Sequence, residues 1–277
     1  MSNELYIAYW SGEEPTGPGK SPTLDMTPDY VDVVPLFYVI LNSNGTLNFN
    51  RLVLHNSKAT ITGWMQDIRA RQKNQPKKTK FTLGILGDAF PLQNPAVFAK
   101  TVKAAVDDWG VDGVTVDYEP PRRDPNIVKV VAAIREEIGS TAIMTAPIYS
   151  AWGGMDQVLK NYAAIFDYIE TMDYTPYIGL QETIDAYEGY AKVIGTADKP
   201  AYSKIAIGVS CMQPSRNNFT PLDDVISLCK YEPPSKDKKL ENKKLGIMLY
   251  TLSYDVSSHG SGYPDGTFTK TIHANLP

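Results

Sequence analysis

The sequence predicts an α/β fold, a single (β/α)8 barrel of eight parallel strands that alternate with helices. About eight short runs of apolar, β-branched or aromatic residues alternate with longer segments of helical period, as in successive βαβ units. No change of composition marks a linker, and the 277 residues are close to the roughly 250 of a typical barrel. We therefore expect one catalytic domain over residues 1–277. An open, doubly wound sheet is the alternative, but no Gly-x-Gly-x-x-Gly sequence supports a dinucleotide site in it.

The expected strands are the short β-branched and aromatic runs Leu5–Tyr9, Val33–Val39, Phe81–Leu86, Gly113–Tyr118, Thr141–Ala146, Tyr168–Asp173, Ile205–Val209 and Gly246–Leu252. The expected helices lie between them, at Thr60–Gln72, Pro95–Trp109, Asn126–Ile138, Met155–Ile165, Leu180–Ile194 and Pro221–Leu228. The segment Gly12–Tyr30 is rich in Pro and Gly, so we expect the first helix to be absent or degenerate. Ser210–Leu245 is too short and too charged for a large inserted subdomain, and the mixed-charge run Lys236–Lys244 predicts a solvated loop or helix face.

The composition excludes several classes of protein. The net charge of −4 argues against a binder of nucleic acid, and no apolar run reaches the roughly 18 residues of a membrane span. Two cysteines (Cys211 and Cys229) and three scattered histidines (His55, His259 and His273) provide neither a disulfide framework nor a metal site. We therefore expect no metal and no cofactor, and chemistry that comes from carboxylates and aromatic rings.

The N-terminus lacks the basic and apolar regions of a signal peptide. Two interpretations stay open: the protein is cytoplasmic, or a leader has been removed from a secreted protein. We expect a monomer with neither nucleic acid nor a membrane as partner.

One predicted strand carries charged residues that a buried strand does not need. Side chains alternate between the two faces of a strand, so Thr115, Asp117 and Glu119 share one face, while Val114 and Val116 share the other. Buried carboxylates are costly, and the C-terminal end of barrel strands is where catalytic residues lie. This pattern predicts an active site. The alternative is that Glu119 has left the strand and is solvated, with Asp117 bound to backbone donors.

The segment DGVTVDYE resembles the Asp-Gly-x-Asp-x-Asp-x-Glu signature of glycoside hydrolase family 18, the chitinases and endo-β-N-acetylglucosaminidases. Asp112, Gly113, Asp117 and Glu119 match the signature, and Thr115 replaces its middle Asp.

Motifs in other strands are similar to the same family in the same order along the chain. Tyr6–Trp10 resembles its first strand and Met144–Pro147 its fifth, while Met172–Tyr174 matches the Met-x-Tyr of its sixth. Gly246–Tyr250 resembles the Gly-x-Met-x-Trp of the eighth strand, with Tyr in place of Trp.

The resemblance implies hydrolysis of β-1,4 bonds at N-acetylglucosamine. In this family the 2-acetamido group of the substrate attacks the anomeric carbon, so one protein acid suffices. Glu119 would be the general acid and base, Asp117 would orient the acetamido group and stabilise its charge, and Tyr174 would hydrogen-bond it. Because two neighbouring carboxylates resist double ionisation, we expect Glu119 to stay protonated while Asp117 stays charged. The expected partner is a polysaccharide or oligosaccharide that contains N-acetylglucosamine.

Further residues are expected to contact the sugar, because aromatic faces suit the apolar side of a pyranose ring. The expected substrate-binding residues are Tyr9, Trp10, Tyr38, Asp112, Thr115, Met172, Tyr177 and Tyr250. Phe37, Tyr149 and Trp152 are additional candidates, although packing at helix–barrel junctions is the alternative for most of these rings. Glu170 either binds sugar hydroxyls or forms an ordinary salt bridge.

Three departures from the family pattern bear on activity. In the family the middle Asp of the signature can share a proton with the Asp beside the catalytic Glu, but Thr115 has no negative charge. We therefore expect weaker sharing of the proton with Asp117 and a pH optimum that differs from that of typical relatives. Thr175 stands where the family has an Asp after the sixth-strand Tyr, and Tyr250 gives a smaller floor for the sugar than Trp.

Chitin or chito-oligosaccharides are the expected substrate, and the chitobiose core of N-glycans is an alternative. A second alternative is a catalytically silent, lectin-like member, although such members commonly lose Glu119 or Asp117. A third is a barrel in which Asp117 and Glu119 bind Mg²⁺ with help from Glu170 and Asp173.

Overall fold

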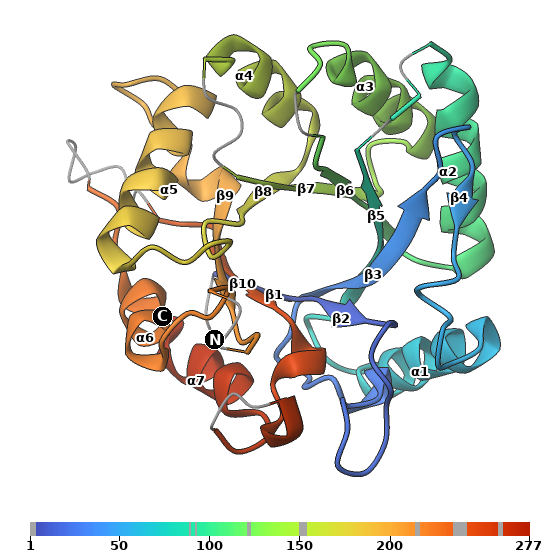
Figure 1. Ribbon diagram of the computed structural model, residues 1–277, viewed down its shortest axis with the longest axis vertical. Helices are drawn as coiled ribbons and strands as arrows, with labels where there is room; N and C mark the ends of the chain where they lie inside the picture. Colours follow the sequence, from blue (N-terminus) through green and yellow to red (C-terminus); the bar gives the residue numbers. More distant parts are fainter. Residues whose placement is uncertain are drawn as a thin grey trace.

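The barrel sheet closes on itself in the computed structural model, which describes residues 4–88, 90–91, 93–120, 123–149, 154–213, 217–234, 243–259 and 263–277. The first strand, β1 (Leu5–Ala8) continued by β2 (Trp10–Ser11), pairs in parallel with β3 (Val33–Leu41) on one side and β10 (Gly246–Tyr250) on the other. Five parallel strands complete the barrel: β5 (Lys80–Gly87), β6 (Gly113–Tyr118), β7 (Ile143–Ile148), β8 (Tyr168–Thr171) and β9 (Ile205–Ser210). The predicted (β/α)8 barrel is confirmed (Figure 1).

A ring of helices surrounds the strands (Figure 1). The described helices are α1 (Lys58–Arg71), α2 (Pro95–Trp109), α3 (Ile127–Ile138), α4 (Asp156–Ile165), α5 (Leu180–Ile194), α6 (Leu222–Lys230) and α7 (Thr267–Asn275). Only a short 3-10 helix, Leu24–Met26, is described between β2 and β3, so the first helix is degenerate, as predicted. In the described part of the chain, no helix is long and apolar enough to cross a membrane.

The sequence pattern missed two elements. Helix α7 buries only Phe268, Thr269 and Ile272, so its apolar period is too weak to be recognised. The short strand β4 (Leu47–Asn48) pairs antiparallel with the end of β3 and lies outside the barrel. Most other boundaries differ from the expected ones by one or two residues, and β6, α2 and α5 have the expected ends.

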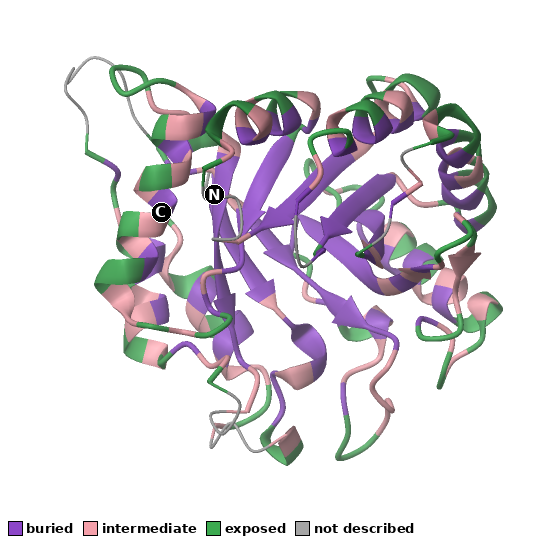
Figure 2. Cartoon of the chain, turned by 45° about the horizontal axis from the view of Figure 1, so that its top comes forward, coloured by how far each residue is buried: buried purple, intermediate pink, exposed green. Residues whose placement is uncertain are grey.

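Two apolar clusters hold the fold together. The larger lies between the strands and the helices and includes Val114, Val116 and Tyr118 from one face of β6. The smaller lies inside the barrel, with Tyr9, Phe37 and other inward side chains. Figure 2 shows the buried strands enclosed by helices whose outer faces are exposed. The outward and inward faces predicted for β6 are therefore correct.

Two expectations fall partly or wholly on residues that are not described. Trp152 lies outside the described residues, and so does most of the charged run Lys236–Lys244. Lys244 itself is buried. Its ammonium group binds the Glu4 carboxylate at 2.7 Å and the carbonyl oxygen of Cys229 at 2.7 Å. The solvated surroundings expected for this run are wrong for Lys244.

Candidate active site

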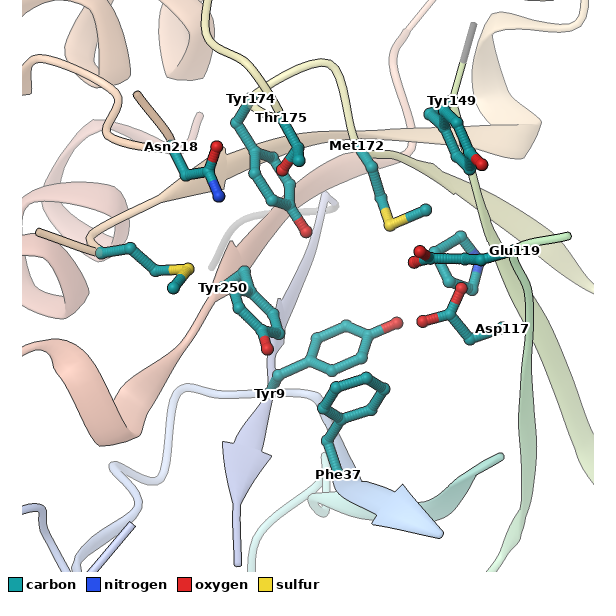
Figure 3. A pocket seen from close by; sticks show the side chains of 12 residues that line it. Tyr9, Phe37, Asp117, Glu119, Tyr149, Met172, Tyr174, Thr175, Asn218 and Tyr250 are labelled. Carbon is teal, nitrogen blue, oxygen red and sulfur yellow. The ribbon is translucent and has the colours of Figure 1, made fainter. Parts of the chain in front are cut away.

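A pocket of about 350 Å³ opens at the C-terminal end of the barrel strands. This volume lies in the range of about 300–1,000 Å³ that is usual for small-molecule sites. Residues from β3, β6, β7 and β10 and from the segments after β1, β6, β7, β8 and β9 line it, as Figure 3 shows: Tyr9, Phe37, Asp117, Glu119, Pro147, Tyr149, Met172, Tyr174, Thr175, Met212, Asn218 and Tyr250. The position is the one at which (β/α)8 barrels carry their active sites.

The carboxyl groups of Asp117 and Glu119 meet at one side of the pocket (Figure 3). Asp117 is 3% exposed and shares a hydrogen bond with Glu119. The backbone of Glu119 continues alongside β5, since its N–H donates to the carbonyl oxygen of Gly87 at 3.1 Å. Its side chain is open to solvent and still lines the pocket. Glu119 thus lies just past the end of β6 and is exposed, as the alternative interpretation expected, while its carboxyl group still meets that of Asp117 in the pocket.

The electrostatics of this pair differ from the sequence expectation. Burial raises the pKa of Asp117 well above its ordinary value, and the charge of Glu119 and the hydrogen bond to it raise this pKa further. The Arg123 guanidinium opposes the increase only in part. Burial and the neighbouring carboxyl group therefore favour the protonated form of Asp117 in the free protein. This direction runs against the expected charged Asp117, because the sequence does not reveal how completely the carboxyl group is buried.

Tyr9 connects the pocket to a carboxyl group beneath it. The Tyr9 hydroxyl donates a hydrogen bond to Oε2 of Glu170, which comes from β8 and is completely buried. Burial raises the pKa of Glu170 to about 7. Glu170 does not line the pocket and forms no salt bridge among the described residues, so neither of the two roles considered for it from the sequence holds.

Aromatic rings form the wall opposite the carboxyl pair. Tyr174 and Tyr250 stack with their ring centroids 6.0 Å apart, and the edge of Tyr250 meets Tyr9 and Phe37 at 5.8 Å each. Offset and edge-on arrangements of this kind are the preferred geometries of aromatic pairs. The wall can hold the apolar face of a sugar ring while the hydroxyl groups remain available as hydrogen-bond donors.

A glycine in β9 makes room for Tyr174. A Cβ atom at Gly208 would lie 2.9 Å from Cε1 of Tyr174 and would collide with the carbonyl oxygen of Thr171. The Gly208 N–H donates to the Thr171 hydroxyl at 3.0 Å, which fixes the two strands at this point. The absence of a side chain at Gly208 thus allows Tyr174 to stand over the barrel.

Neither a family model nor a curated protein matches this sequence. Solved structures match it over almost the whole chain. A family 18 chitinase from Chromobacterium violaceum has a TM-score of 0.68 at 18% identity, covering 99% of this chain and 84% of that one. A chitinase from Bacteroides thetaiotaomicron has a TM-score of 0.70 at 14% identity, covering 99% and 97%. A fungal endo-β-N-acetylglucosaminidase of family 18 has a TM-score of 0.65 at 14% identity, covering 98% and 97%.

The chain has the fold of glycoside hydrolase family 18. Within this barrel, the structure brings together Asp117, Glu119 and Tyr174, for which the resemblance implied catalytic roles. Three of the residues expected to bind substrate also line the pocket, namely Tyr9, Met172 and Tyr250.

Trp10 and Tyr38 do not line the pocket. Trp10 alternates with the inward Tyr9, so it faces outward, where its indole N–H donates to the carbonyl oxygen of Pro22 at 3.1 Å. Tyr38 is an extra residue in a β-bulge of β3, because the pairing with β5 shifts between Phe37 and Val39. The bulge leaves Phe37 as the ring of β3 that lines the pocket.

Asp112, Thr115 and Tyr177 also lie away from the pocket, so their expected contacts with substrate are wrong. Asp112 is at the opposite end of β6, where its carboxylate binds Arg69 at 3.0 Å and Lys80 at 3.1 Å.

Thr115 is sealed inside the barrel, and its hydroxyl bonds those of Thr82 at 2.7 Å and Thr145 at 2.9 Å. The hydroxyl group of Tyr177 donates to Asp224 at 2.6 Å. Strand alternation predicts the face of a side chain but neither its depth in the barrel nor its partner, which explains these three errors.

Other lining residues were missed or were only secondary candidates. Phe37 and Tyr149 were candidates, and Met212 and Asn218 were not singled out. Met212 follows the end of β9, so its position after a strand is the only signal that points to it. Among the described residues, no group of three or more His, Cys, Asp or Glu side chains is arranged to hold a metal ion.

Proposed function

We propose that this chain is a chitinase-type glycosidase that hydrolyses β-1,4 linkages at N-acetylglucosamine in chitin or chito-oligosaccharides. The observation that carries the proposal is the pair Asp117 and Glu119, which share a hydrogen bond at the edge of an aromatic pocket. The fold of the chitinases listed above supports the same conclusion.

The spacing of the carboxyl groups favours help from the substrate over a protein nucleophile. Retaining glycosidases with a protein nucleophile keep their two carboxyl groups about 5–5.5 Å apart, and inverting ones about 6.5–9.5 Å apart. Asp117 and Glu119 are within hydrogen-bonding distance of each other, so they cannot act from opposite faces of a sugar ring. Attack by the 2-acetamido oxygen of the substrate needs only one protein acid.

The first step breaks the glycosidic bond. Glu119 gives a proton to the glycosidic oxygen while the acetamido oxygen bonds to the anomeric carbon, and the leaving sugar departs with that proton. The product is an oxazolinium ion that carries a positive charge. In this step Glu119 carries the proton that is given to the leaving oxygen, and the Asp117 carboxylate holds the acetamido N–H.

The second step restores Glu119. Its carboxylate takes a proton from a water molecule, whose oxygen adds to the anomeric carbon and opens the oxazolinium ring. Two successive inversions at this carbon retain its configuration. The hydroxyl group of Tyr174 holds the acetamido group during both steps, and Tyr250 provides the floor for the ring.

Two alternative functions share this site. An endo-β-N-acetylglucosaminidase would cut the same kind of bond in the core of an N-glycan, and one of the structural neighbours is such an enzyme. A lectin-like member would bind the sugar without cleaving it, but it would have no use for the pair formed by Asp117 and Glu119. The magnesium enzyme considered from the sequence has no such support, because Glu170 and Asp173 do not line the pocket.

The decisive experiment incubates the protein with chito-oligosaccharides and, separately, with a high-mannose glycopeptide, and determines the products by mass spectrometry. The proposal expects shorter chito-oligosaccharides and no change in the glycopeptide. Release of the glycan would establish the endo-β-N-acetylglucosaminidase instead. Sugar binding without any product would establish the silent member.

A further inference from the structure

Glu170 is a completely buried carboxyl group for which the reaction proposed above has no role. It lies on the inward face of β8, two residues before Met172, which lines the pocket, so it is one layer deeper in the barrel. Oε2 accepts a hydrogen bond from the Tyr9 hydroxyl, and Oε1 has no well-formed hydrogen bond. A carboxyl group in such a place is costly for the fold, which calls for a function.

The groups that face Glu170 carry no positive charge. They are the phenols of Tyr9, Tyr168 and Tyr174, the hydroxyl of Thr145 and the carboxyl group of Asp117. The salt bridges among the described residues include none to Glu170. Its charge, when present, therefore acts on Asp117 and the phenols without being neutralised by a cation.

We propose that Glu170 is a positioning residue for the pair formed by Asp117 and Glu119. The hydrogen bond from Tyr9 holds the Glu170 carboxylate in place, and its buried negative charge keeps the catalytic proton on the pair at neutral and alkaline pH. The proposal rests on the function proposed above. It assigns to Glu170 neither contact with the substrate nor a proton-transfer step.

The direction of the effect follows from electrostatics. Glu170 has a pKa of about 7, so it is neutral below about pH 6 and negative above about pH 8. A buried negative charge disfavours a second one nearby, and Glu170 raises the pKa of Asp117 accordingly. Above neutral pH, the charged Glu170 keeps a proton on the pair that would otherwise be lost. The enzyme then remains active at higher pH than a variant that lacks this charge.

The variant Glu170→Gln removes the charge and keeps the size and the hydrogen-bond acceptor for Tyr9. The matched control is Asp173→Asn, which removes a buried carboxyl group three residues away. Asp173 has a pKa raised by burial to about 6, but its Oδ1 accepts from Tyr190 of α5 at 3.4 Å, on the outer side of the strand. Both variants are first checked for folding by their thermal unfolding.

The first measurement is the pH dependence of kcat/KM for a chito-oligosaccharide between pH 4 and 9. We expect the three proteins to have similar profiles below pH 6. The alkaline limb of the Glu170→Gln profile should lie about one pH unit lower than that of the wild type. The ratio of kcat/KM at pH 8.5 to kcat/KM at pH 5 should therefore be about tenfold smaller in the variant than in the wild type. Asp173→Asn should keep the wild-type limb. Superimposable profiles, or an equal shift in the control, would overturn the proposal.

A second measurement does not depend on activity or on the folding of a variant. In wild-type protein labelled with ¹³C at the Asp and Glu carboxyl carbons, NMR follows the titration of Asp117, Glu119 and Glu170. We expect the Asp117 signal to change as Glu170 ionises near pH 7, and the titration of the pair to move to lower pH in Glu170→Gln. If the Asp117 signal does not change as Glu170 ionises, this inference is overturned. If the two titrations are coupled but the protein cleaves no substrate, only the proposed function is overturned.

Discussion

The Tyr9 hydroxyl donates a hydrogen bond to Glu170 across the interior of the barrel, although β9 and β10 separate their strands in the sheet. The bond fixes the Tyr9 ring in the floor of the pocket, edge-on to Phe37 at 5.5 Å and to Tyr250 at 5.8 Å. It also links Tyr9, which lines the pocket, to the Glu170 carboxyl group, which does not.

Replacement of Glu119 by Gln should abolish most of the hydrolysis of chito-oligosaccharides. Gln cannot supply the proton to the leaving oxygen, and loss of general acid catalysis costs about 10²–10⁴-fold in rate. The measurement is kcat/KM by product analysis, with Glu136→Gln on the exposed face of α3 as the control that should leave it unchanged. A Glu119→Gln protein with the wild-type rate would show that the observed hydrolysis comes from another source.

Replacement of Tyr174 by Phe should lower kcat about 10- to 100-fold while the fold is kept. The variant loses only the hydroxyl group, and a hydrogen bond to a group that gains charge contributes about 1.5–3 kcal/mol. Tyr177→Phe is the matched control, because its hydroxyl binds Asp224 outside the pocket. Steady-state kinetics of both variants decide the point: an equal loss in Tyr177→Phe would place the effect in the stability of the segment after β8.

Replacement of Thr115 by Asp should shift the pH–rate profile. Thr115 shares the inward face of β6 with Asp117, so a carboxylate there adds a negative charge beneath the pair. We expect the alkaline limb to move to higher pH, because an added negative charge hinders ionisation of the pair. Thr115→Asn, which adds the same bulk without a charge, is the control. Profiles of wild type and Thr115→Asp that coincide would contradict the prediction.

The stability of the fold should decrease as the pH rises from about 4.5 to 7. Burial raises the pKa of Glu170 from 4.5 to about 7 and that of Asp173 from 3.8 to about 6. Over this interval the folded protein holds protons that the unfolded chain has lost, so the free energy of unfolding falls as the pH rises, by roughly 3 kcal/mol for Glu170 and roughly 2 kcal/mol for Asp173. The contribution is complete below the unfolded-state pKa values and is lost above the folded-state ones.

Thermal unfolding measured at intervals between pH 4.5 and 8 tests this expectation. The wild-type Tm should fall across the interval, and the double variant Glu170→Gln/Asp173→Asn should show a flatter dependence. A wild-type Tm that rises through this range, or a double variant with the same slope, would show that these two groups do not determine the pH dependence.

The sequence by itself predicted the barrel and the pair of carboxyl groups that line its pocket. Alternation of apolar and helical segments implies parallel βαβ units, and the period of two along a strand placed Thr115 and Asp117 on the inner face of β6, with Glu119 just past its end. These features depend on local geometry, which short segments carry in their own pattern. The degenerate first helix after β2 followed for the same reason, from its Pro and Gly content.

Only the tertiary structure decided how deeply each side chain of the site is buried, which residues it contacts and how its pKa is shifted. The bulge at Tyr38 brings Phe37 into the pocket, and Asp112 lies at the opposite end of β6 with Arg69. The link from Tyr9 to Glu170 joins residues 161 positions apart, which no local pattern encodes. Burial and long-range neighbours set the free energy of each charge, and here they raise the pKa of Asp117 well above its ordinary value. The sequence thus placed the acid pair, and the closed barrel determined its electrostatics.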